Sequence, residues 1–489
     1  MRPEFKEAVK IAATGEYKCI PVSLELYADQ YTPLMVLRKL KNVSRHCYML
    51  ESAEDNQKWG RYTFLGYDPR LEITCTNGKL TIKNGTSVNM ETKHPGEYIR
   101  QILDENKSPK IEGFPTFTGG LVGYFSYDYM KYAEPSLVLD AEDKEGFKDV
   151  DLMLFDKVIA FDHFRQKIIL IVNIRCEDLK TEYHRAELEL STMKQLIQSG
   201  EMAEEIPGRC TSEFRALFDQ KQYCSMVEKA KHYIREGDIF QVVLSNRMEV
   251  DYEGSLLDTY RVLRTVNPSP YMFYFSSDDI EIAGASPETL ARLAGTELST
   301  FPLAGTRPRG KTKEEDLVLE KGLLADEKER AEHNMLVDLG RNDIGKISKI
   351  GTVNVEKYMC IERFSHVMHI GSTVTGQIRD DRDAVDAVDA ILPAGTLSGA
   401  PKFRACQIIQ ELEQSKRGIY GGAIGYLDFA GNLDTCIAIR LVYKKNGEIC
   451  IRSGAGIVAD SIPESEFQEC CNKARAVVQA IETAQEGLE

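Results

Sequence analysis

Short β-rich runs, each bounded by glycine, asparagine or proline, recur along the whole chain and limit the folds that it can adopt. Residues 17–175 alternate in this way, and RLEITCTNGKLTIKNG turns at Asn77-Gly78, which is a hairpin signal. Later runs include DIFQVVLSNRMEV, IYGGAIGYLDF, CIAIRLVY and EICIRSGAGIV, and these strands outnumber those that a doubly wound sheet needs. Helical patterns lie between them over 313–342, 401–416 and 464–484. The alternation predicts an α+β fold of mostly antiparallel sheets covered by helices.

The chain divides most naturally near residue 200. At 489 residues it exceeds the usual size of one simple core, which favours one large α/β domain or two closely packed halves. A helical pattern over 180–200 leads into SGEMAEEIPGRCTSEF, whose glycine, proline and acidic residues are typical of a connection. We therefore expect one half over 17–195 and a second over 212–484.

Composition excludes several classes of function. The net charge of −15 argues against a nucleic-acid partner, because phosphate binding needs clustered Lys and Arg. The 12 cysteines include no CxxC pair, so neither a disulfide framework nor a zinc site is indicated. The N-terminus lacks an apolar signal region, and no run approaches the ~18 apolar residues of a membrane span. We expect a cytoplasmic protein without a membrane partner.

Two helical stretches each carry a pair of glutamates one turn apart. Glu329 and Glu332 lie three residues apart, as do Glu466 and Glu469, and Pro463 marks the start of the second helix. Taken alone, such a pair is most often a solvated helix face. If both pairs faced one cavity, however, their charges would need a divalent cation or raised pKa values. Mg²⁺ suits such a site best, because it takes oxygen ligands and keeps several waters.

Two glycine-containing loops, FPLAGTRPRG and LPAGTLSGAPK, match neither a P-loop nor a dinucleotide fingerprint, and each alone could be a tight turn. Together with AEHNMLVDLGRND, YGGAIGY and DSIPESEFQECCNKARA, in this order along the chain, they resemble the chorismate-utilising enzymes. The resemblance runs from about residue 20 to residue 480. It implies that family's α/β sandwich of two sheets around a central cleft.

The resemblance also assigns roles to individual residues of a predicted active site. Glu332 and Glu469 match the ligands of the family's Mg²⁺, with Glu329 and Glu466 holding metal-bound waters. The metal would bind the ring carboxylate of chorismate. The remaining substrate contacts implied are Thr306, Tyr420, Arg440, Gly454, Ala455, Gly456 and Lys473. Without the family, an ordinary surface ion pair would be the more common role of Arg440.

The predicted catalytic positions are His369, Thr396 and Gln241. His369 matches the family's active-site histidine, and Thr396 matches a residue that contacts the reacting ring. A lone histidine between apolar neighbours is otherwise more often structural. In a strand, however, alternation turns His369 away from Met368 and Ile370, as expected for a residue that faces a cleft.

Two departures from other family members favour ammonia as the nucleophile. Members that use water carry an activating lysine where this chain has Gln241, and an amide cannot act as a base. Members that form aminodeoxychorismate carry a nucleophilic lysine where this chain has Ala304. The resemblance therefore implies amination of chorismate and loss of pyruvate to give anthranilate, on the way to tryptophan. The alternatives are an aminodeoxychorismate-forming enzyme of folate synthesis and a catalytically inactive chorismate or amino-acid sensor.

A partner must supply the ammonia, because this chain has no GxCxG nucleophile motif; the nearest string, GRCTS, lacks the second glycine. The resemblance implies a small glutaminase (amidotransferase) subunit, commonly in a heterotetramer of two large and two small chains.

The resemblance further implies a binding site for L-tryptophan as a feedback inhibitor. Its residues come from MLES and NPSPYMF, together with one arginine: Leu50, Glu51, Ser52, Arg61, Pro270, Tyr271 and Met272. As bare sequence, NPSPYMF is a proline-containing turn that enters a strand. With the family assigned, a pocket separate from the metal site would make the inhibition allosteric.

Overall fold

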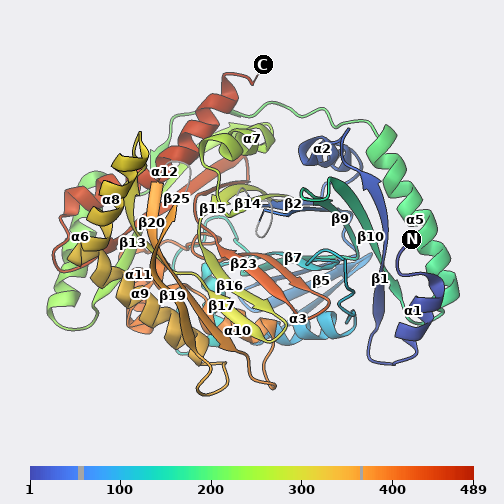
Figure 1. The fold of residues 1–489 in the computed structure, drawn as a ribbon. Coiled ribbons are helices and arrows are strands. Elements are labelled where there is room, and N and C mark those ends of the chain that lie inside the picture. Colours follow the sequence, from blue (N-terminus) through green and yellow to red (C-terminus); the bar gives the residue numbers. More distant parts are fainter. Residues whose placement is uncertain (53–59, 364–366, 489) are drawn as a thin grey trace.

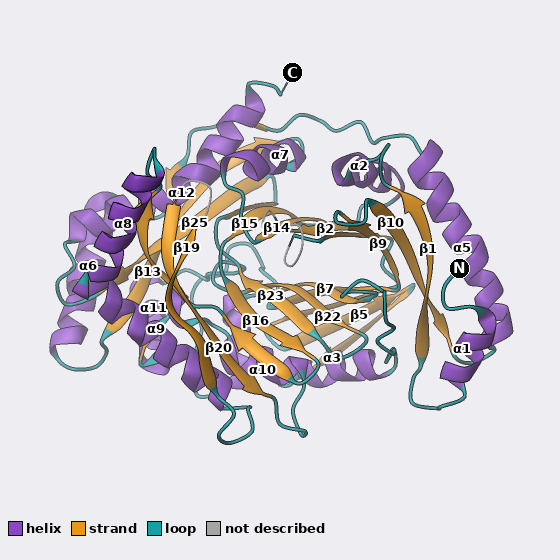
Figure 2. Cartoon of the chain, viewed as in Figure 1, coloured by secondary structure: helices purple, strands orange, loops and turns teal. Residues whose placement is uncertain are grey.

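A computed structural model describes residues 1–52, 60–363 and 367–488 of the chain. Two large sheets lie face to face, and helices cover their outer faces (Figures 1 and 2). All strand ladders in the described ranges are antiparallel. The predicted α+β class, with two mostly antiparallel sheets, is thus confirmed.

The first sheet has 13 strands. Its order across the sheet is β1 (Cys19–Tyr27), β10 (Lys167–Arg175), β9 (Lys157–Asp162), β3 (Tyr62–Tyr67), β2 (Cys47–Glu51), β14 (Tyr271–Ser276), β15 (Glu281–Ser286), β24 (Leu441–Lys445), β25 (Glu448–Ile457), β13 (Gln241–Glu253) and β11 (Arg209–Cys210). Two short strands, β12 (Arg215–Ala216) and β21 (Gly399–Ala400), also pair with β13.

The second sheet has 12 strands. Its order is β18 (Leu303–Pro308), β20 (Val367–Gln377), β17 (Glu297–Thr300), β16 (Thr289–Ala294), β23 (Leu433–Ile437), β22 (Ala423–Asp428), β7 (Gly120–Phe125), β8 (Val150–Phe155), β4 (Leu71–Thr76), β5 (Lys79–Asn84) and β6 (Thr86–Glu91), and β19 (Asn354–Arg363) pairs with β20.

The helices are α1 (Phe5–Ala12), α2 (Pro33–Val43), α3 (Pro95–Asp104), α4 (Met130–Ala133), α5 (Leu179–Ser199), α6 (Gln220–Arg235), α7 (Leu257–Val266), α8 (Lys313–Ala325), α9 (Glu327–Gly345), α10 (Ala384–Ile391), α11 (Lys402–Glu413) and α12 (Pro463–Gln485). Two 3₁₀ turns, η1 (Tyr127–Tyr129) and η2 (Gly395–Leu397), complete the described elements.

Both sheets combine strands from the two ends of the chain. In the first sheet β2 pairs with β14, and Glu51 lies opposite Met272. In the second sheet β7 pairs with β22, and Gly123 lies opposite Gly425. Figure 1 shows these pairs as neighbouring arrows of distant colours. The two halves expected from the sequence, 17–195 and 212–484, therefore share both sheets, and their boundaries stay a prediction.

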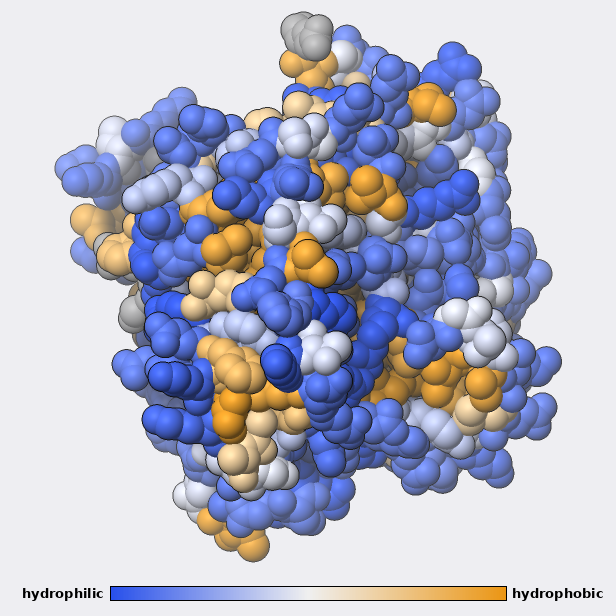
Figure 3. All heavy atoms as spheres, turned by 90° about the vertical axis from the view of Figure 1, so that its right-hand side faces the viewer, coloured by the Kyte–Doolittle hydropathy of each residue, from blue (hydrophilic) through white to orange (hydrophobic). Residues whose placement is uncertain are grey.

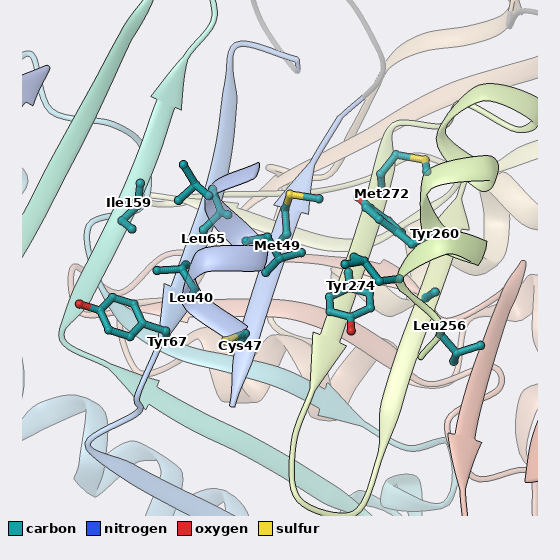
Figure 4. Close-up of a cluster of buried hydrophobic side chains, with 14 of the residues drawn as sticks. Leu40, Cys47, Met49, Leu65, Tyr67, Ile159, Leu256, Tyr260, Met272 and Tyr274 are labelled. Carbon is teal, nitrogen blue, oxygen red and sulfur yellow. The ribbon is translucent and has the colours of Figure 1, made fainter. Parts of the chain in front are cut away.

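Three apolar layers hold the sheets and helices together. Aromatic side chains fill the space between the sheets, where the ring of Tyr48 on β2 meets that of Phe155 on β8 at 4.7 Å between centroids. On the outer face of the first sheet, α2 and α7 pack on β2, β3 and β14 through residues such as Leu40, Met49 and Tyr260 (Figure 4). On the outer face of the second sheet, α3, α9 and α10 supply a separate cluster.

Local sequence signals explain most element boundaries. Asn77 and Gly78 have φ values of 48° and 81°, so the predicted hairpin between β4 and β5 forms with the turn residues that tolerate positive φ. The prediction of a single helix over 313–342 is wrong in one respect, because the structure has two helices there, separated at Asp326. The Asp326 side chain accepts hydrogen bonds from the backbone N–H groups of Lys328 and Glu329 and so begins a new helix, α9.

On the face that carries α5, hydrophilic side chains predominate and hydrophobic residues form small separate groups (Figure 3). Within the described ranges, no helix combines the length and the apolar character that crossing a bilayer would require.

Tyr48 provides a test of the core between the sheets. Its hydroxyl group is buried and has no hydrogen-bond partner among the described residues. Tyr48→Phe removes this hydroxyl group and with it an unsatisfied buried polar group. The free energy of unfolding should therefore either stay unchanged or rise by up to about 1 kcal/mol. Tyr274→Phe is the matched control. The Tyr274 hydroxyl accepts a hydrogen bond from Lys41 Nζ at 2.6 Å, so its removal should lower the free energy of unfolding by about 1 kcal/mol or more. Urea unfolding of both variants measures the difference, and equal destabilisation would contradict the assignment.

Candidate active site

A cavity of about 680 Å³ lies where the β13/β25 end of the first sheet approaches β18 and β20 of the second. Helices α9 and α12 contribute further walls. Thirteen predicted site residues line it: Gln241, Thr306, Glu329, Glu332, His369, Thr396, Tyr420, Arg440, Gly454, Gly456, Glu466, Glu469 and Lys473. Ala455 does not line it, because strand alternation turns its side chain into the apolar cluster beneath α6 and α11. Segments from 241 to 473 thus meet around one space.

Four carboxylates converge on this cavity from two helices. Glu329 and Glu332 lie on α9, and Glu466 and Glu469 lie on α12. Burial, followed by repulsion from Glu329 and Glu469, raises the pKa of Glu332. Burial also raises the pKa of Glu466, and the charge of Glu469 adds to that effect. The carboxylates therefore act on one another across the gap between the helices.

These carboxylates could hold a cation only together with other ligands. Among residues 1–52, 60–363 and 367–488, no group of three or more His, Cys, Asp or Glu side chains is gathered closely enough to hold a metal ion. Two of the carboxylates have cationic partners: Glu329 lies 3.2 Å from Arg307 Nη1, and Glu469 lies 2.6 Å from Lys473 Nζ. The oxygen donors and the remaining repulsion fit a hard divalent cation whose coordination is completed by water or by an anionic ligand.

His369 faces the cavity in a defined protonation state. Its Nδ1 lies 2.9 Å from the Gly305 carbonyl oxygen, which can only accept, so Nδ1 carries the proton and Nε2 can accept one. Burial, and then the positive charge of Arg440, lower its pKa, so the ring is neutral near pH 7. Met368 and Ile370 are buried on the opposite side of β20, which confirms the predicted alternation.

Two cationic groups, Arg440 and Lys473, also line the cavity, and Lys473 lies on the same helix α12 as Glu469. The Arg440 guanidinium donates to the Lys473 carbonyl oxygen at 3.2 Å, and in the described part of the chain it forms no ion pair with a carboxylate. Its predicted alternative role, an ordinary surface ion pair, does not match these contacts. Lys473 Nζ also donates to the Gly454 carbonyl oxygen at 3.0 Å. An anionic ligand would give both cations additional partners.

Gly456 allows Gln241 to approach the strand β25. A Cβ atom at position 456 would lie 2.6 Å from Gln241 Nε2, so a larger residue there would push that amide out of its present position. Gln241 is itself 3% exposed. Its amide is therefore a fixed part of the cavity wall.

Glu288 is a cavity residue that the sequence analysis missed. It lies in the bend between β15 and β16, is buried, and accepts a hydrogen bond from Thr396 Oγ1 at 3.2 Å. Burial raises its pKa to about 8, so the carboxyl group carries a proton near neutral pH. The available signal was a single acidic residue after Pro287, between the apolar strands EIAGAS and TLARLA. A protonated acid in a cavity wall can donate its proton to a leaving group.

A second cavity, of about 490 Å³, lies between the sheets near β2, β14, β22 and β23. All seven residues predicted for an inhibitor site line it: Leu50, Glu51, Ser52, Arg61, Pro270, Tyr271 and Met272. Aromatic side chains that the sequence analysis did not include extend its walls, among them Phe64, Phe114 and Tyr426.

The charged groups of the second cavity already have partners. The Glu51 carboxylate accepts from Tyr260 Oη at 2.6 Å and from Arg264 Nε at 2.5 Å. Arg61 pairs with Asp162 at 2.8 Å. Tyr271 donates to Asp434, a cavity residue that the sequence analysis also missed, at 2.8 Å.

Comparison with known proteins gives one consistent result. The family model described as chorismate binding enzyme matches residues 45–479. Two similar curated proteins are anthranilate synthase component 1 of Acetivibrio thermocellus, 46% identical over 490 residues and 98% of each chain, and that of Acinetobacter calcoaceticus, 46% identical over 487 residues and 97% of each.

Solved structures agree with these relatives. Anthranilate synthase component I of Streptococcus pneumoniae is 38% identical and superimposes with a TM-score of 0.74 over 85% of this chain and 92% of that one. The menaquinone-specific isochorismate synthase of Escherichia coli is 19% identical, with a TM-score of 0.70 over 97% of this chain and 99% of the other, and so shares the fold.

Glu288 gives the site a testable pH dependence. Its pKa in the folded protein is about 8, above its ordinary value of 4.5, so the folded state holds a proton that the unfolded state releases. As pH rises from about 5 to about 8, the free energy of unfolding should therefore fall relative to that of Glu288→Gln, by at most about 1.4 kcal/mol per pH unit. Above pH 8 the difference should stop growing. Urea unfolding between pH 5 and 9 measures it, and parallel curves would contradict a buried protonated Glu288.

Proposed function

This chain belongs to the family of chorismate-binding enzymes, and from that premise we propose that it is the chorismate-aminating large component of an anthranilate synthase. The overall reaction converts chorismate and ammonia into anthranilate, pyruvate and water. The observation that carries the proposal is the cavity that four glutamates from α9 and α12 line together with Arg440 and Lys473. Near-full-length similarity to component 1 of anthranilate synthases supports the same activity.

Chorismate is a dianion, and the cavity offers complementary groups for both of its carboxylates. Arg440, Lys473 and the backbone around Gly454 and Gly456 take one carboxylate through charge-assisted hydrogen bonds. The divalent cation of the family, which we assign as Mg²⁺, would be held by Glu332 and Glu469, with Glu329 and Glu466 binding its waters. When bound, the ion neutralises the ring carboxylate and orients the ring. Burial first, and then repulsion from Glu329 and Glu469, raise the pKa of Glu332, and a cation at this position would offset both effects.

The cavity wall favours ammonia over a lysine or an activated water as the nucleophile. Gln241 and Ala304 both line the cavity, and neither side chain can act as a base or a nucleophile. Ammonia adds to the ring as its hydroxyl group departs, and Glu288 donates the proton that converts this hydroxyl into water. The enolpyruvyl group then leaves as the enolate of pyruvate when a ring proton passes to His369 Nε2, and the enolate takes up a proton at its methylene carbon to become pyruvate. Thr396 holds Glu288 through its hydroxyl.

The ammonia comes from a second component. We assign this partner as a small glutaminase subunit that assembles with the present chain, commonly two copies of each. Support comes from the name component 1 of the relatives and from the missing GxCxG motif.

Activity with purified protein tests the proposal. Incubation with chorismate, Mg²⁺ and ammonium should release pyruvate and produce the blue fluorescence of anthranilate. Glu332→Ala and Glu469→Ala should each lower the rate by about 100-fold or more, because an essential charge partner is lost. Glu327→Ala, an exposed glutamate on the same helix α9, is the matched control and should retain the wild-type rate. A 4-amino product without pyruvate, or a rate independent of Mg²⁺, would refute the assignment.

The second cavity is proposed to bind L-tryptophan as a feedback inhibitor. Its aromatic and apolar walls suit an indole ring, and Ser52 and Glu51 both line it. Because the Glu51 carboxylate is already paired with Arg264, it contributes to the amino-acid site mainly by fixing this part of the wall. The cavity is separate from the one that binds chorismate, so the inhibition is allosteric.

Ser52→Phe should fill part of the second cavity and raise the tryptophan concentration for half-inhibition by about 10-fold or more, while anthranilate formation without tryptophan stays near the wild-type rate. Ser87→Phe, at an exposed serine on β6, is the control for adding a phenyl ring. Inhibition curves of the two variants provide the measurement, and unchanged inhibition in Ser52→Phe would remove the regulatory assignment.

A further inference from the structure

A buried network of three charged side chains adjoins the active-site cavity, and one of them, Arg452, lines it. Glu413 at the end of α11 accepts from Arg417 Nη2 at 2.5 Å and Nε at 2.9 Å, and from Arg452 Nη2 at 3.1 Å. The side chains of Glu413, Arg417 and Arg452 are only 1%, 1% and 2% exposed. Ser245 on β13 also binds this carboxylate: its backbone N–H donates to Glu413 Oε1 at 2.7 Å.

Arg417 joins this network to three separate segments of the cavity wall. Its Nη1 donates to the Leu397 carbonyl oxygen at 2.6 Å, and its Nη2 donates to the Val243 carbonyl oxygen at 2.8 Å. Its guanidinium carbon lies 4.7 Å from the ring centre of Tyr127 and 5.7 Å from that of Tyr420. Val243, Leu397 and Tyr420 all line the cavity, whereas Arg417 does not.

The contacts of Arg417 use features that only a guanidinium group has. Two N–H groups pair with Glu413 while others reach carbonyl oxygens in different directions, and the flat face lies against aromatic rings. A lysine ammonium has three donors at a single point and cannot make this planar set of contacts. Because a buried ion pair by itself adds little net stability, its contribution here is to fix geometry.

The network also leaves a positive charge under the cavity. Two arginines surround one glutamate, so the trio carries a net charge of +1 in a region that excludes water. Burying an uncompensated charge is costly, and a dianionic ligand above it lowers that cost. Arg452 itself lines the cavity, close to the strand that carries Gly454 and Gly456.

We infer that Arg417 is a positioning residue for the amination of chorismate: it holds the Tyr420 ring and the two segments that carry Thr396 and Gln241 in register, without touching the substrate. The inference rests on the proposed function, because it takes these three residues to act on bound chorismate. Thr396 directly precedes Leu397, and Gln241 lies two residues before Val243, so each bonded carbonyl group is close to a residue of the site. A displacement of about 1 Å in such a site can cost about 100-fold in rate.

Arg417→Lys tests this role because it maintains the charge and removes the planar contacts. We expect kcat/KM for chorismate to fall by about 10- to 100-fold, with a higher KM and a lower kcat. Arg247→Lys is the matched control: Arg247 is a buried arginine on β13, the strand that carries Val243, and lies 3.1 Å from Glu145 and 2.6 Å from Glu249, but it does not line the cavity. Its kcat/KM should stay within about twofold of wild type while its loss of stability is comparable.

A double-mutant cycle separates positioning from general damage to the fold. If Arg417 acts through Tyr420, then Arg417→Lys should reduce kcat/KM much less in a Tyr420→Phe background than in the wild type. The same non-additive result is expected with Thr396→Val. The inference would be overturned if the two substitutions lowered kcat/KM independently in both cycles. It would also be overturned if Arg417→Lys lowered kcat/KM no more than Arg247→Lys does.

A second variant keeps the test decisive if Arg417→Lys does not fold. Glu413→Gln retains an oxygen acceptor but removes the charge that orients Arg417, so it should show the same non-additive pattern with a smaller loss. A wild-type enzyme that forms no anthranilate would refute the proposed function. An active wild type with a fully active Arg417→Lys would refute only the role of Arg417.

Discussion

Antiparallel pairing between strands that lie far apart in the chain creates both cavities of this molecule. β13 pairs along its length with β25, from Val242 opposite Ile457 to Asp251 opposite Glu448, and this ladder forms one side of the active-site cavity. β2 pairs with β14 over Cys47–Glu51, and these two strands carry Leu50, Glu51, Tyr271, Met272 and Phe273 of the second cavity. Neither space exists within one continuous segment: the active-site cavity needs segments between residues 241 and 473, and the second cavity needs segments between residues 50 and 436.

The active-site cavity contains charges of both signs, which the proposed function needs in order to hold a cation and a dianion. The carboxylates of α9 and α12 repel one another, Lys473 on α12 pairs with Glu469, and Arg440 adds a second cation from the connection between β23 and β24. In a partly buried site these interactions are stronger than in water. Glu288 differs from the other carboxyl groups of the cavity in its pKa. Burial raises this pKa to about 8, and no cationic side chain of the described residues contacts the carboxyl group to lower it again. One cavity therefore contains several carboxylates and one neutral carboxyl group, to which the proposed function assigns metal binding and proton transfer.

The two cavities adjoin the same bend of the second sheet. Tyr271, from the wall of the second cavity, lies 2.9 Å from Thr289 Oγ1, and Thr289 follows Glu288 in the chain. The hydrophobic layer between the sheets surrounds the second cavity, whereas ionised side chains surround the first. This contrast matches an aromatic inhibitor in one and an anionic substrate in the other.

The sequence by itself determined the α+β class, the Asn77-Gly78 hairpin, the direction in which His369 points, and most of the cavity residues, because turn chemistry and strand alternation act locally and the motifs retain their order. The tertiary structure alone decided the pKa of Glu288, the ion network around Arg417, the pairing of Glu51 with Arg264, and the exclusion of Ala455 from the cavity wall. It also broke the helix at Asp326. Burial and charge pairing depend on which distant segments meet, and no local pattern of residues contains that information.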